Sequence, residues 1–281
     1  MLTVKEALLQ AHQATATYSE TPALDAQVLL AEILRMPRAW VLSHGEEQIG
    51  WPEASAIKSA IRRCRDGEPL PYILGWWEFF GRRFHVSPAT LIPRPETELL
   101  VELALENLRA VRREKRTADI GTGTGCIAVT IAAEIEDVHV VATDASEAAL
   151  RVARSNAIDH DVEERLSFVC CDLLGCLKSR YDVVCANLPY IPTGELECLA
   201  VSRWEPRLAL DGGTDGLQLL GRMLSDLPRT LSAGGLALFE IGESQWDLAA
   251  SVARQTLPGW GIQVLTDLAG RHRVLRIEPG R

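Results

Sequence analysis

From residue 117 onward the chain alternates between short apolar stretches and amphipathic ones, and this alternation limits the fold more than any other feature. Strands are expected at residues 118–120, 138–143, 166–171, 182–186 and 236–241, with helices between them such as 126–133 and 146–157. Strand–helix–strand units of this kind favour a doubly wound, mainly parallel, Rossmann-like α/β sheet. Two further strand-like stretches, 261–265 and 272–277, flank a glycine-containing turn, which predicts a closing antiparallel hairpin.

Residues 1–70 differ because their apolar side chains repeat at helical spacing. Val4, Ala7 and Ala11 form one such stripe. The Thr21-Pro22 pair is a typical start for a second helix. No group of residues suited to catalysis is found in this region. It is predicted to be a small helical-bundle domain that serves recognition or packing.

Residues 71–95 are aromatic and punctuated by glycine, which predicts a β-hairpin linker. Pro93 and Pro95 keep the chain extended before the next helix begins. The third part of the chain, residues 96–281, then forms the α/β domain.

The bulk properties exclude several classes of protein. A net charge of −9 over 281 residues favours a substrate other than nucleic acid, because nucleic-acid-binding proteins usually carry a basic surplus on one face, although local basic patches are compatible with this charge. The apolar stretches are too short to cross a bilayer, and the N-terminus lacks the pattern of a secretory signal. The seven cysteines include no C-x-x-C pair, so buried free thiols are expected rather than a metal site. We therefore expect a monomeric cytoplasmic protein with no membrane or direct nucleic-acid contact.

A glycine-rich loop follows the first predicted strand and opens a helix. It consists of Gly121, Thr122, Gly123, Thr124 and Gly125. Glycines there let the backbone turn sharply and approach a ligand closely, although a tight turn without a ligand would look the same. Asp144 ends the next strand, where it can accept hydrogen bonds from two ribose hydroxyls. Asp172 ends the third strand, where its carboxylate can reach an adenine amino group.

The spacing of the glycines distinguishes two nucleoside ligands. Dinucleotide-binding loops follow G-x-G-x-x-G and hold a pyrophosphate at the helix N-terminus. Here Cys126 occupies the position after the third glycine of a G-x-G-x-G pattern. This spacing, together with the closing hairpin, favours S-adenosylmethionine, which has no pyrophosphate.

The acceptor site is predicted directly after the fourth strand, at the carboxyl edge of the sheet. The residues are Asn187, Leu188, Pro189 and Tyr190. An amide or aniline-type nitrogen is a poor nucleophile because its lone pair is delocalised. The Asn187 side-chain oxygen and the Leu188 carbonyl can accept its two N–H groups, aim the lone pair at a methyl group and stabilise the developing positive charge. Tyr190 offers a flat face to a planar group; a proline turn capped by asparagine is the alternative without function.

Three stretches resemble the bacterial release-factor glutamine methyltransferases, the PrmC or HemK family, in order and separation. They are Ile92-Pro93-Arg94-Pro95-Glu96-Thr97-Glu98, the glycine loop, and Asn187-Leu188-Pro189-Tyr190-Ile191-Pro192. Two more family-like stretches are Glu205-Pro206-Arg207-Leu208-Ala209-Leu210 and Phe239-Glu240-Ile241-Gly242. The similarity covers nearly the whole chain, and the stretch around Arg94 is the most specific because generic methyltransferases lack it.

The resemblance implies a class I methyltransferase fold and methylation of the side-chain N5 of glutamine in the Gly-Gly-Gln motif of class 1 release factors. It implies that the glycine loop, Asp144, the Asp172-Leu173 pair and Asn187 hold the cofactor. It further implies that residues 187–190 hold the glutamine, with the helical domain gripping the release factor. Two positions depart from the family: Leu188 replaces a usual proline, and Leu173 replaces a frequent aromatic residue.

Two other functions compete with this one. Asn-Leu-Pro-Tyr also occurs in ribosomal RNA adenine-N6 methyltransferases, whose target nitrogen poses the same chemical problem. The acidic charge, the helical domain and the segment from Arg94 to Glu98 argue against that reading. A non-catalytic protein that binds release factors is the remaining alternative, and it predicts no tight binding of S-adenosylmethionine.

Overall fold

The computed structural model describes residues 2–280, and the chain divides into two compact units between Trp76 and Trp77. The first unit is helical, as the apolar spacing predicted. Its helices are α1 (Val4–Thr15), α2 (Pro22–Leu34), α3 (Arg38–Ser43), α4 (Trp51–Arg65) and α5 (Leu70–Leu74). Helix α1 packs on α2 and α4 through buried small residues such as Ala7 and Ala11. Thr3 begins α1 with a capping box in which its side chain and that of Glu6 each accept from the other's backbone N–H.

The predicted hairpin is shorter than expected. Residues 70–74 form helix α5, and the hairpin consists only of β1 (Trp76–Phe79) and β2 (Arg82–His85). Pro71 lies in the first turn of this helix, where a missing N–H costs no hydrogen bond, and Gly75 ends it in the left-handed conformation. Phe79 and Phe84 of the hairpin are fully buried in the core of the second unit.

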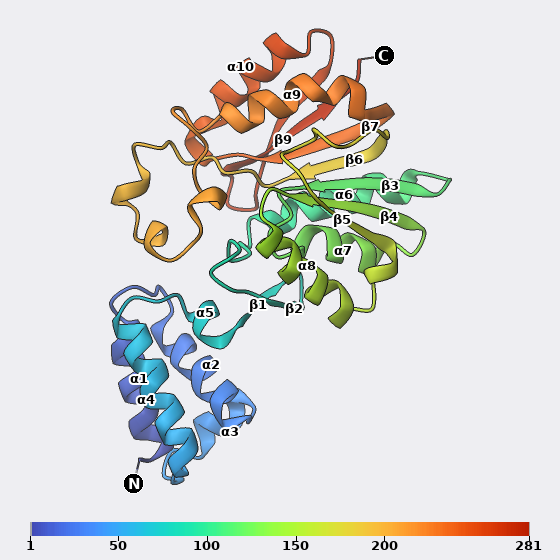
Figure 1. Cartoon of the computed structure of the whole chain (residues 1–281). Helices are drawn as coiled ribbons and strands as arrows, with labels where there is room; N and C mark the ends of the chain where they lie inside the picture. The colour runs from blue at the N-terminus through green and yellow to red at the C-terminus, as the bar shows by residue number, and fades with distance from the viewer. Residues whose placement is uncertain (1, 281) are drawn as a thin grey trace. The chain divides into compact units, whose positions relative to one another are not determined.

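The second unit contains a seven-stranded sheet of order β5-β4-β3-β6-β7-β9-β8 (Figure 1). Its strands are β3 (Lys115–Ile120), β4 (Val138–Asp144), β5 (Leu166–Cys170), β6 (Tyr181–Ala186), β7 (Leu231–Glu240), β8 (Gly261–Thr266) and β9 (His272–Glu278). All neighbours pair in parallel except β9, which runs antiparallel to both β7 and β8. The doubly wound sheet with a closing hairpin is therefore confirmed. The strands β4 and β5 are added on one side of β3 and the strands from β6 onward on its other side, so the strand order reverses between β3 and β6.

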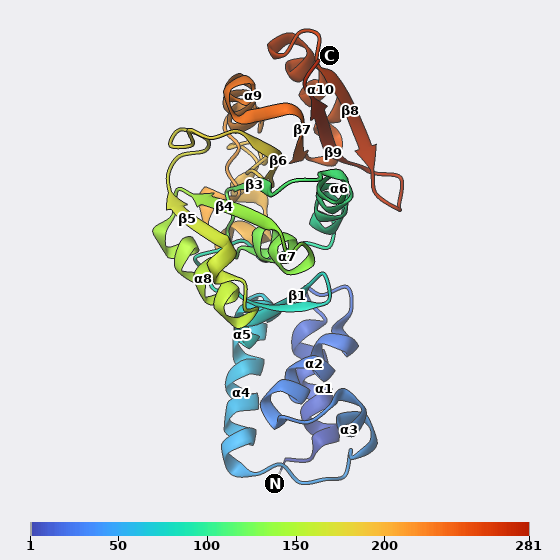
Figure 2. The same ribbon diagram turned by 90° about the vertical axis from the view of Figure 1, so that its right-hand side faces the viewer.

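Helices cover both faces of this sheet (Figure 2). They are α6 (Thr97–Ala110), α7 (Cys126–Glu134), α8 (Glu147–Asp159), α9 (Gln218–Thr230) and α10 (Trp246–Thr256). Strand residues alternate between the two cores: Val183 packs on the side of α6 and α7, and Val184 packs on the side of α9 and α10. Short 3-10 turns complete the unit: η1 (Glu163–Arg165), η2 (Leu196–Cys198), η3 (Ala200–Arg203), η4 (Arg207–Ala209) and η5 (Glu243–Gln245).

Gly125 joins the glycine loop to α7 in a position that excludes larger residues. Its φ is +80°, and a Cβ there would lie 3.0 Å from the Ala153 Cβ and 3.2 Å from the Ala153 Cα of α8. We expect Gly125→Ala to lower the free energy of unfolding by about 1–3 kcal/mol, measured by urea unfolding. Gly194→Ala is the matched control, because its added methyl meets no atom within 4 Å. Equal stability of the two variants would contradict the close approach of α7 and α8.

Candidate active site

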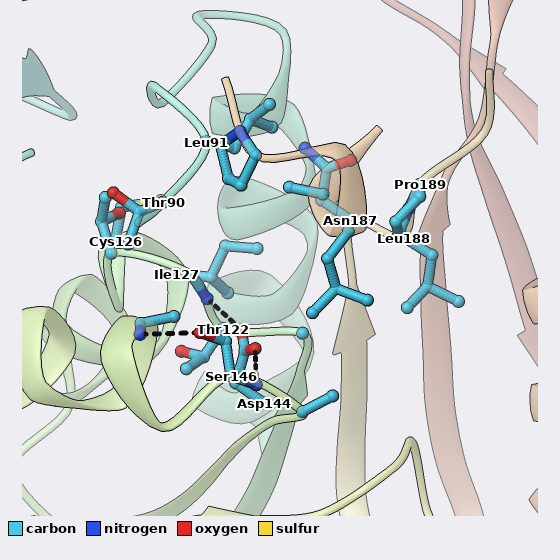
Figure 3. A pocket seen from close by; sticks show the side chains of 18 of the residues that line it. Thr90, Leu91, Thr122, Cys126, Ile127, Asp144, Ser146, Asn187, Leu188 and Pro189 are labelled. Atoms are coloured by element: carbon cyan, nitrogen blue, oxygen red, sulfur yellow. Dashed lines mark hydrogen bonds between the residues drawn. The ribbon is translucent and has the colours of Figure 1, made fainter. Parts of the chain in front are cut away.

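One cavity of the second unit lies at the carboxyl ends of β3, β4 and β6, where the strand order reverses (Figure 3). Among the residues that line it are Thr90, Leu91, Pro93, Arg94, Thr97, Gly121, Thr122, Gly123, Thr124, Asp144, Ser146, Cys171, Asp172, Leu173, Asn187, Leu188, Pro189, Pro206 and Leu208. The predicted cofactor loop and the predicted acceptor loop thus face a single cavity. The described chain, residues 2–280, contains no cluster of His, Cys, Asp or Glu that could hold a metal.

The glycine loop forms the floor of the cavity. Gly121 and Gly123 have φ values of +71° and +56°, which side chains rarely adopt. A Cβ at Gly123 would have only the Gly121 carbonyl near it, 4.0 Å away, so the space in front of this loop is open. Gly125 was predicted to bind the cofactor, but it does not line the cavity and packs against Ala153 instead.

Asp144 connects the glycine loop to the start of α8. Its carboxylate accepts from the Gly123 N–H at 3.0 Å and from the Ser146 N–H at 2.8 Å. Burial raises the pKa of Asp144, and these two hydrogen bonds act against that rise. The carboxylate therefore fixes the shape of the loop while it lines the cavity.

Asp119 supports the same loop from below and was not singled out from the sequence. Its carboxylate accepts from the Thr122 hydroxyl at 2.6 Å and from the Ala128 N–H at 3.2 Å. Complete burial raises the pKa of Asp119 to about 7, and the nearby Asp144 adds to the rise. Its other oxygen, Oδ1, has no hydrogen-bond partner within residues 2–280. Asp119 is fully buried and does not line the cavity, so it supports the loop from behind, whereas Asp144 reaches the cavity itself.

Asp172 and Leu173 follow β5 and also line the cavity. Leu173 has a φ of +51°, and Asp172 is ion-paired with Arg222 of α9 while its side chain is 64% exposed. The contact predicted between Asp172 and an adenine amino group stays a prediction.

The cysteines differ from the expectation of buried free thiols. Cys171 and Cys176 are joined by a disulfide across the turn that holds Asp172 and Leu173. The turn closes through a hydrogen bond from the Gly175 N–H to the Asp172 carbonyl, which brings the two cysteine Cα atoms within 6.2 Å. Cys170 and Cys198 are free but exposed. Among the cysteines that the structure describes, only Cys64, Cys126 and Cys185 are the buried free thiols that were expected.

The acceptor loop follows β6, which is buried along its whole length. Asn187, Leu188 and Pro189 line the cavity on the side facing the glycine loop, as Figure 3 shows. Leu188 is only 6% exposed and reaches within 3.6 Å of where a Gly121 Cβ would lie. Tyr190 does not line the cavity. Burial raises the pKa of the Tyr190 hydroxyl to about 12. The predicted contact between the flat face of Tyr190 and a planar acceptor stays a prediction.

Asn187 is held by residues from two other elements. Its Nδ2 donates to the Thr97 hydroxyl at 3.0 Å, and that hydroxyl donates to the Glu240 carboxylate at 2.6 Å. Arg94, at the rim of the cavity, is ion-paired with Glu205, whose side chain is 1% exposed. The family-like stretches noted in the sequence therefore meet around this cavity, although they are far apart along the chain.

Two family models match the chain: the PrmC N-terminal domain over residues 6–75 and the methyltransferase small domain over residues 96–203. The release factor glutamine methyltransferase of Moorella thermoacetica is 40% identical over 275 residues, which cover 97% of each chain. The protein of the same name from Coxiella burnetii is 37% identical over 280 residues, or 98% of each chain. The chain belongs to the release factor glutamine methyltransferase family. It is an S-adenosylmethionine-dependent methyltransferase, as the glycine spacing predicted.

A solved methyltransferase from Pyrococcus furiosus shares the fold of this family member. The two chains are 16% identical with a TM-score of 0.53, and the match covers 72% of this chain and 91% of the other. At this identity the similarity concerns the sheet and its helices alone.

Several residues of this release factor glutamine methyltransferase site were missed from the sequence. Thr97 and Glu240 were quoted only as parts of family-like stretches, and no role was predicted for either. Pro206 and Leu208, which line the cavity, belong to another such stretch. A polar residue buried at the end of an apolar strand, such as Glu240, is the one local signal that could have indicated a role.

The cavity fits S-adenosylmethionine. The space in front of Gly123 is open, so a ligand can approach this part of the loop closely, and the Asp144 carboxylate offers an acceptor to a ligand that carries hydrogen-bond donors and no phosphate. The residues that would hold the cofactor all line the cavity: Gly121, Thr122, Gly123, Thr124, Asp144, Asp172, Leu173 and Asn187.

Proposed function

We propose that this protein transfers a methyl group from S-adenosylmethionine to the side-chain N5 of the glutamine in the Gly-Gly-Gln motif of class 1 release factors. The observation that carries the proposal is that Asn187, Leu188 and Pro189 line the same cavity as the glycine loop. The relatives of this chain are named release factor glutamine methyltransferases, which supports the choice of a protein amide as the acceptor.

The acceptor loop performs the chemistry by orienting one nitrogen. The Asn187 Oδ1 and the Leu188 carbonyl each accept one N–H of the glutamine amide, which draws the lone pair out of conjugation. The cofactor supplies an electrophilic methyl group on a sulfonium. These two acceptors would stabilise the positive charge that develops on the nitrogen as it takes up the methyl group from the sulfonium. The alkylated nitrogen is acidic, so its proton leaves to water without a strong base.

The walls of the cavity suit a thin, flexible peptide. Pro93, Pro206 and Leu208 form an apolar rim beside the acceptor loop, and Leu208 is 61% exposed. Glycines beside the target glutamine would let a peptide loop enter between such walls without a side-chain clash.

The test incubates the purified protein with methyl-labelled S-adenosylmethionine and either a class 1 release factor or ribosomal RNA. Label is expected in the release factor alone, and a release factor with its Gly-Gly-Gln glutamine changed to alanine is expected to take up none. Label in RNA alone would replace the proposal with adenine-N6 methylation, and an absence of any transfer or cofactor binding would indicate a non-catalytic binding protein.

We propose further that the protein acts as a monomer in the cytoplasm, without membrane or direct nucleic-acid contact. Within residues 2–280 no helix is long and apolar enough to span a membrane. A net charge of −9 is also unfavourable for phosphate binding.

A further inference from the structure

Three polar side chains from three different elements meet behind the acceptor loop. Asn187 follows β6, Thr97 begins α6 and Glu240 ends β7. The Asn187 Nδ2 lies 3.0 Å from the Thr97 hydroxyl, which lies 2.6 Å from a Glu240 carboxylate oxygen. Thr97 is 2% exposed and Glu240 is 6% exposed, so water does not compete for these contacts.

The directions of these hydrogen bonds are fixed by chemistry. An ionised carboxylate only accepts, so Thr97 must donate its single proton to Glu240 and accept from Asn187. The Asn187 side chain also lies close enough to Glu240 to lower the pKa of that carboxyl. The Asn187 amide therefore points its Nδ2 inward, and within residues 2–280 no group donates to its Oδ1.

The orientation of this amide decides whether the acceptor loop can work. The two ends of an asparagine amide have nearly the same shape but opposite hydrogen-bonding character. With Oδ1 toward the cavity, Asn187 accepts an N–H of the target amide. With the amide turned over, two donors would face the N–H groups of the substrate and repel them.

We infer that Thr97 and Glu240 are positioning residues that fix the Asn187 amide with its oxygen toward the target nitrogen. The inference rests on the proposed function, because that function makes Asn187 the acceptor of a substrate N–H. Neither residue is required to touch the substrate: both act through Asn187.

The surroundings of Glu240 make the arrangement sensitive to pH. Burial is the main cause that raises the pKa of Glu240 to about 7; the charge of Glu96 raises it further, whereas Thr97, Arg273 and Asn187 lower it. The side chains of Tyr190 and Cys126 also lie within its electrostatic reach, as their own raised pKa values reflect. Above this pKa the carboxylate can only accept, which fixes the direction of the Thr97 hydroxyl. Below it, the neutral carboxyl can also donate to Thr97, so the orientation of the Asn187 amide is no longer fixed.

The first test compares Thr97→Val with Thr97→Ser at saturating S-adenosylmethionine. Valine keeps the shape but removes the hydroxyl, so we expect kcat to fall about 10-fold or more with little change in the KM for the cofactor. Serine keeps the hydroxyl and is expected to retain the wild-type kcat. Wild-type kcat in Thr97→Val, or an equal loss in both variants, would overturn the inference.

The second test measures kcat against pH for the wild type and Glu240→Gln. The wild-type kcat is expected to fall as the pH drops through about 7, where Glu240 takes up its proton. The glutamine variant should show a low kcat, reduced about 10-fold, without that acidic limb. In Thr97→Val the limb should move to higher pH, because a donor that lowers the Glu240 pKa is lost. Asp119, whose pKa is also about 7, is unchanged in Glu240→Gln, so only the part of the acidic limb that this variant loses is assigned to Glu240. An acidic limb unchanged in Glu240→Gln would overturn the inference.

A substrate-free measurement separates this inference from the proposed function. In a ¹⁵N NMR spectrum, the Asn187 side-chain amide is identified as the signal lost in Asn187→Asp. Its shift is expected to change with a midpoint near pH 7 in the wild type and to be constant in Glu240→Gln. A signal that does not respond to pH in the wild type overturns the inference. Failure of the wild type to methylate a release factor overturns the proposed function alone.

Discussion

Asn187→Ala is expected to lower kcat for methyl transfer by about 100- to 1000-fold, because it removes an acceptor aimed at charge that develops in the transition state. The affinity for S-adenosylmethionine should stay within a few-fold, since Gly121–Thr124 and Asp144 are untouched. Single-turnover rates with a class 1 release factor and calorimetric titration of the cofactor measure the two quantities. A near wild-type rate in Asn187→Ala would disprove the role of this side chain.

Leu188→Pro is the matched control for that variant. The predicted second acceptor is the backbone carbonyl of residue 188, which proline retains, and proline is the residue usual in the family at this position. We expect kcat to change little. A loss as large as that of Asn187→Ala would show that the Leu188 side chain, rather than its carbonyl, matters for the reaction.

Asp144→Ala is expected to weaken binding of S-adenosylmethionine by about 10- to 150-fold, which corresponds to the ~1.5–3 kcal/mol of hydrogen bonds to a charged group. Two effects act together: the carboxylate is lost from the cavity, and the Gly123 and Ser146 N–H groups lose their acceptor. Calorimetric titration gives the dissociation constant, and thermal unfolding without ligand shows how much the loop itself is destabilised.

Asp172→Ala provides the comparison for Asp144→Ala. Its carboxylate is largely exposed and already neutralised by Arg222, so we expect a smaller loss of cofactor affinity. An equal loss in the two variants would support the contact between Asp172 and an adenine amino group that the sequence predicted.

The parts of the fold that depend on local pattern could be predicted from the sequence. The strands from β3 to β9 are each within a few residues of their predicted bounds, except β7, which begins five residues earlier at Leu231. Periodicity of two and of 3.6 residues carries that information in short windows. Helix α5 was missed because its Pro-Tyr-Ile-Leu sequence is short and aromatic, which a strand would also permit.

The candidate site could be predicted only in part, for a physical reason. The glycine loop and the acceptor loop, residues 187–190, are each a single continuous segment. Each follows a strand of the parallel sheet, which places both at the carboxyl edge. Thr97 and Glu240 are 143 residues apart, and their hydrogen bond exists only once α6 lies on β7. The packing of Gly125 against Ala153, which removes it from the cavity, likewise depends on tertiary structure.

The position of β3 between β4 and β6 has a consequence for how such enzymes diversify. The donor half of the cavity is built by the segment that runs from β3 to β5, and the acceptor half is built by later segments together with residues 89–97, which precede β3. Substitutions after β6 can therefore change which acceptor is methylated while the residues that bind the methyl donor stay the same. Leu188 is the exception, because its side chain reaches across to Gly121. Leu188 is therefore the residue at which the two halves meet, with its carbonyl on the acceptor side and its side chain packed on the donor side.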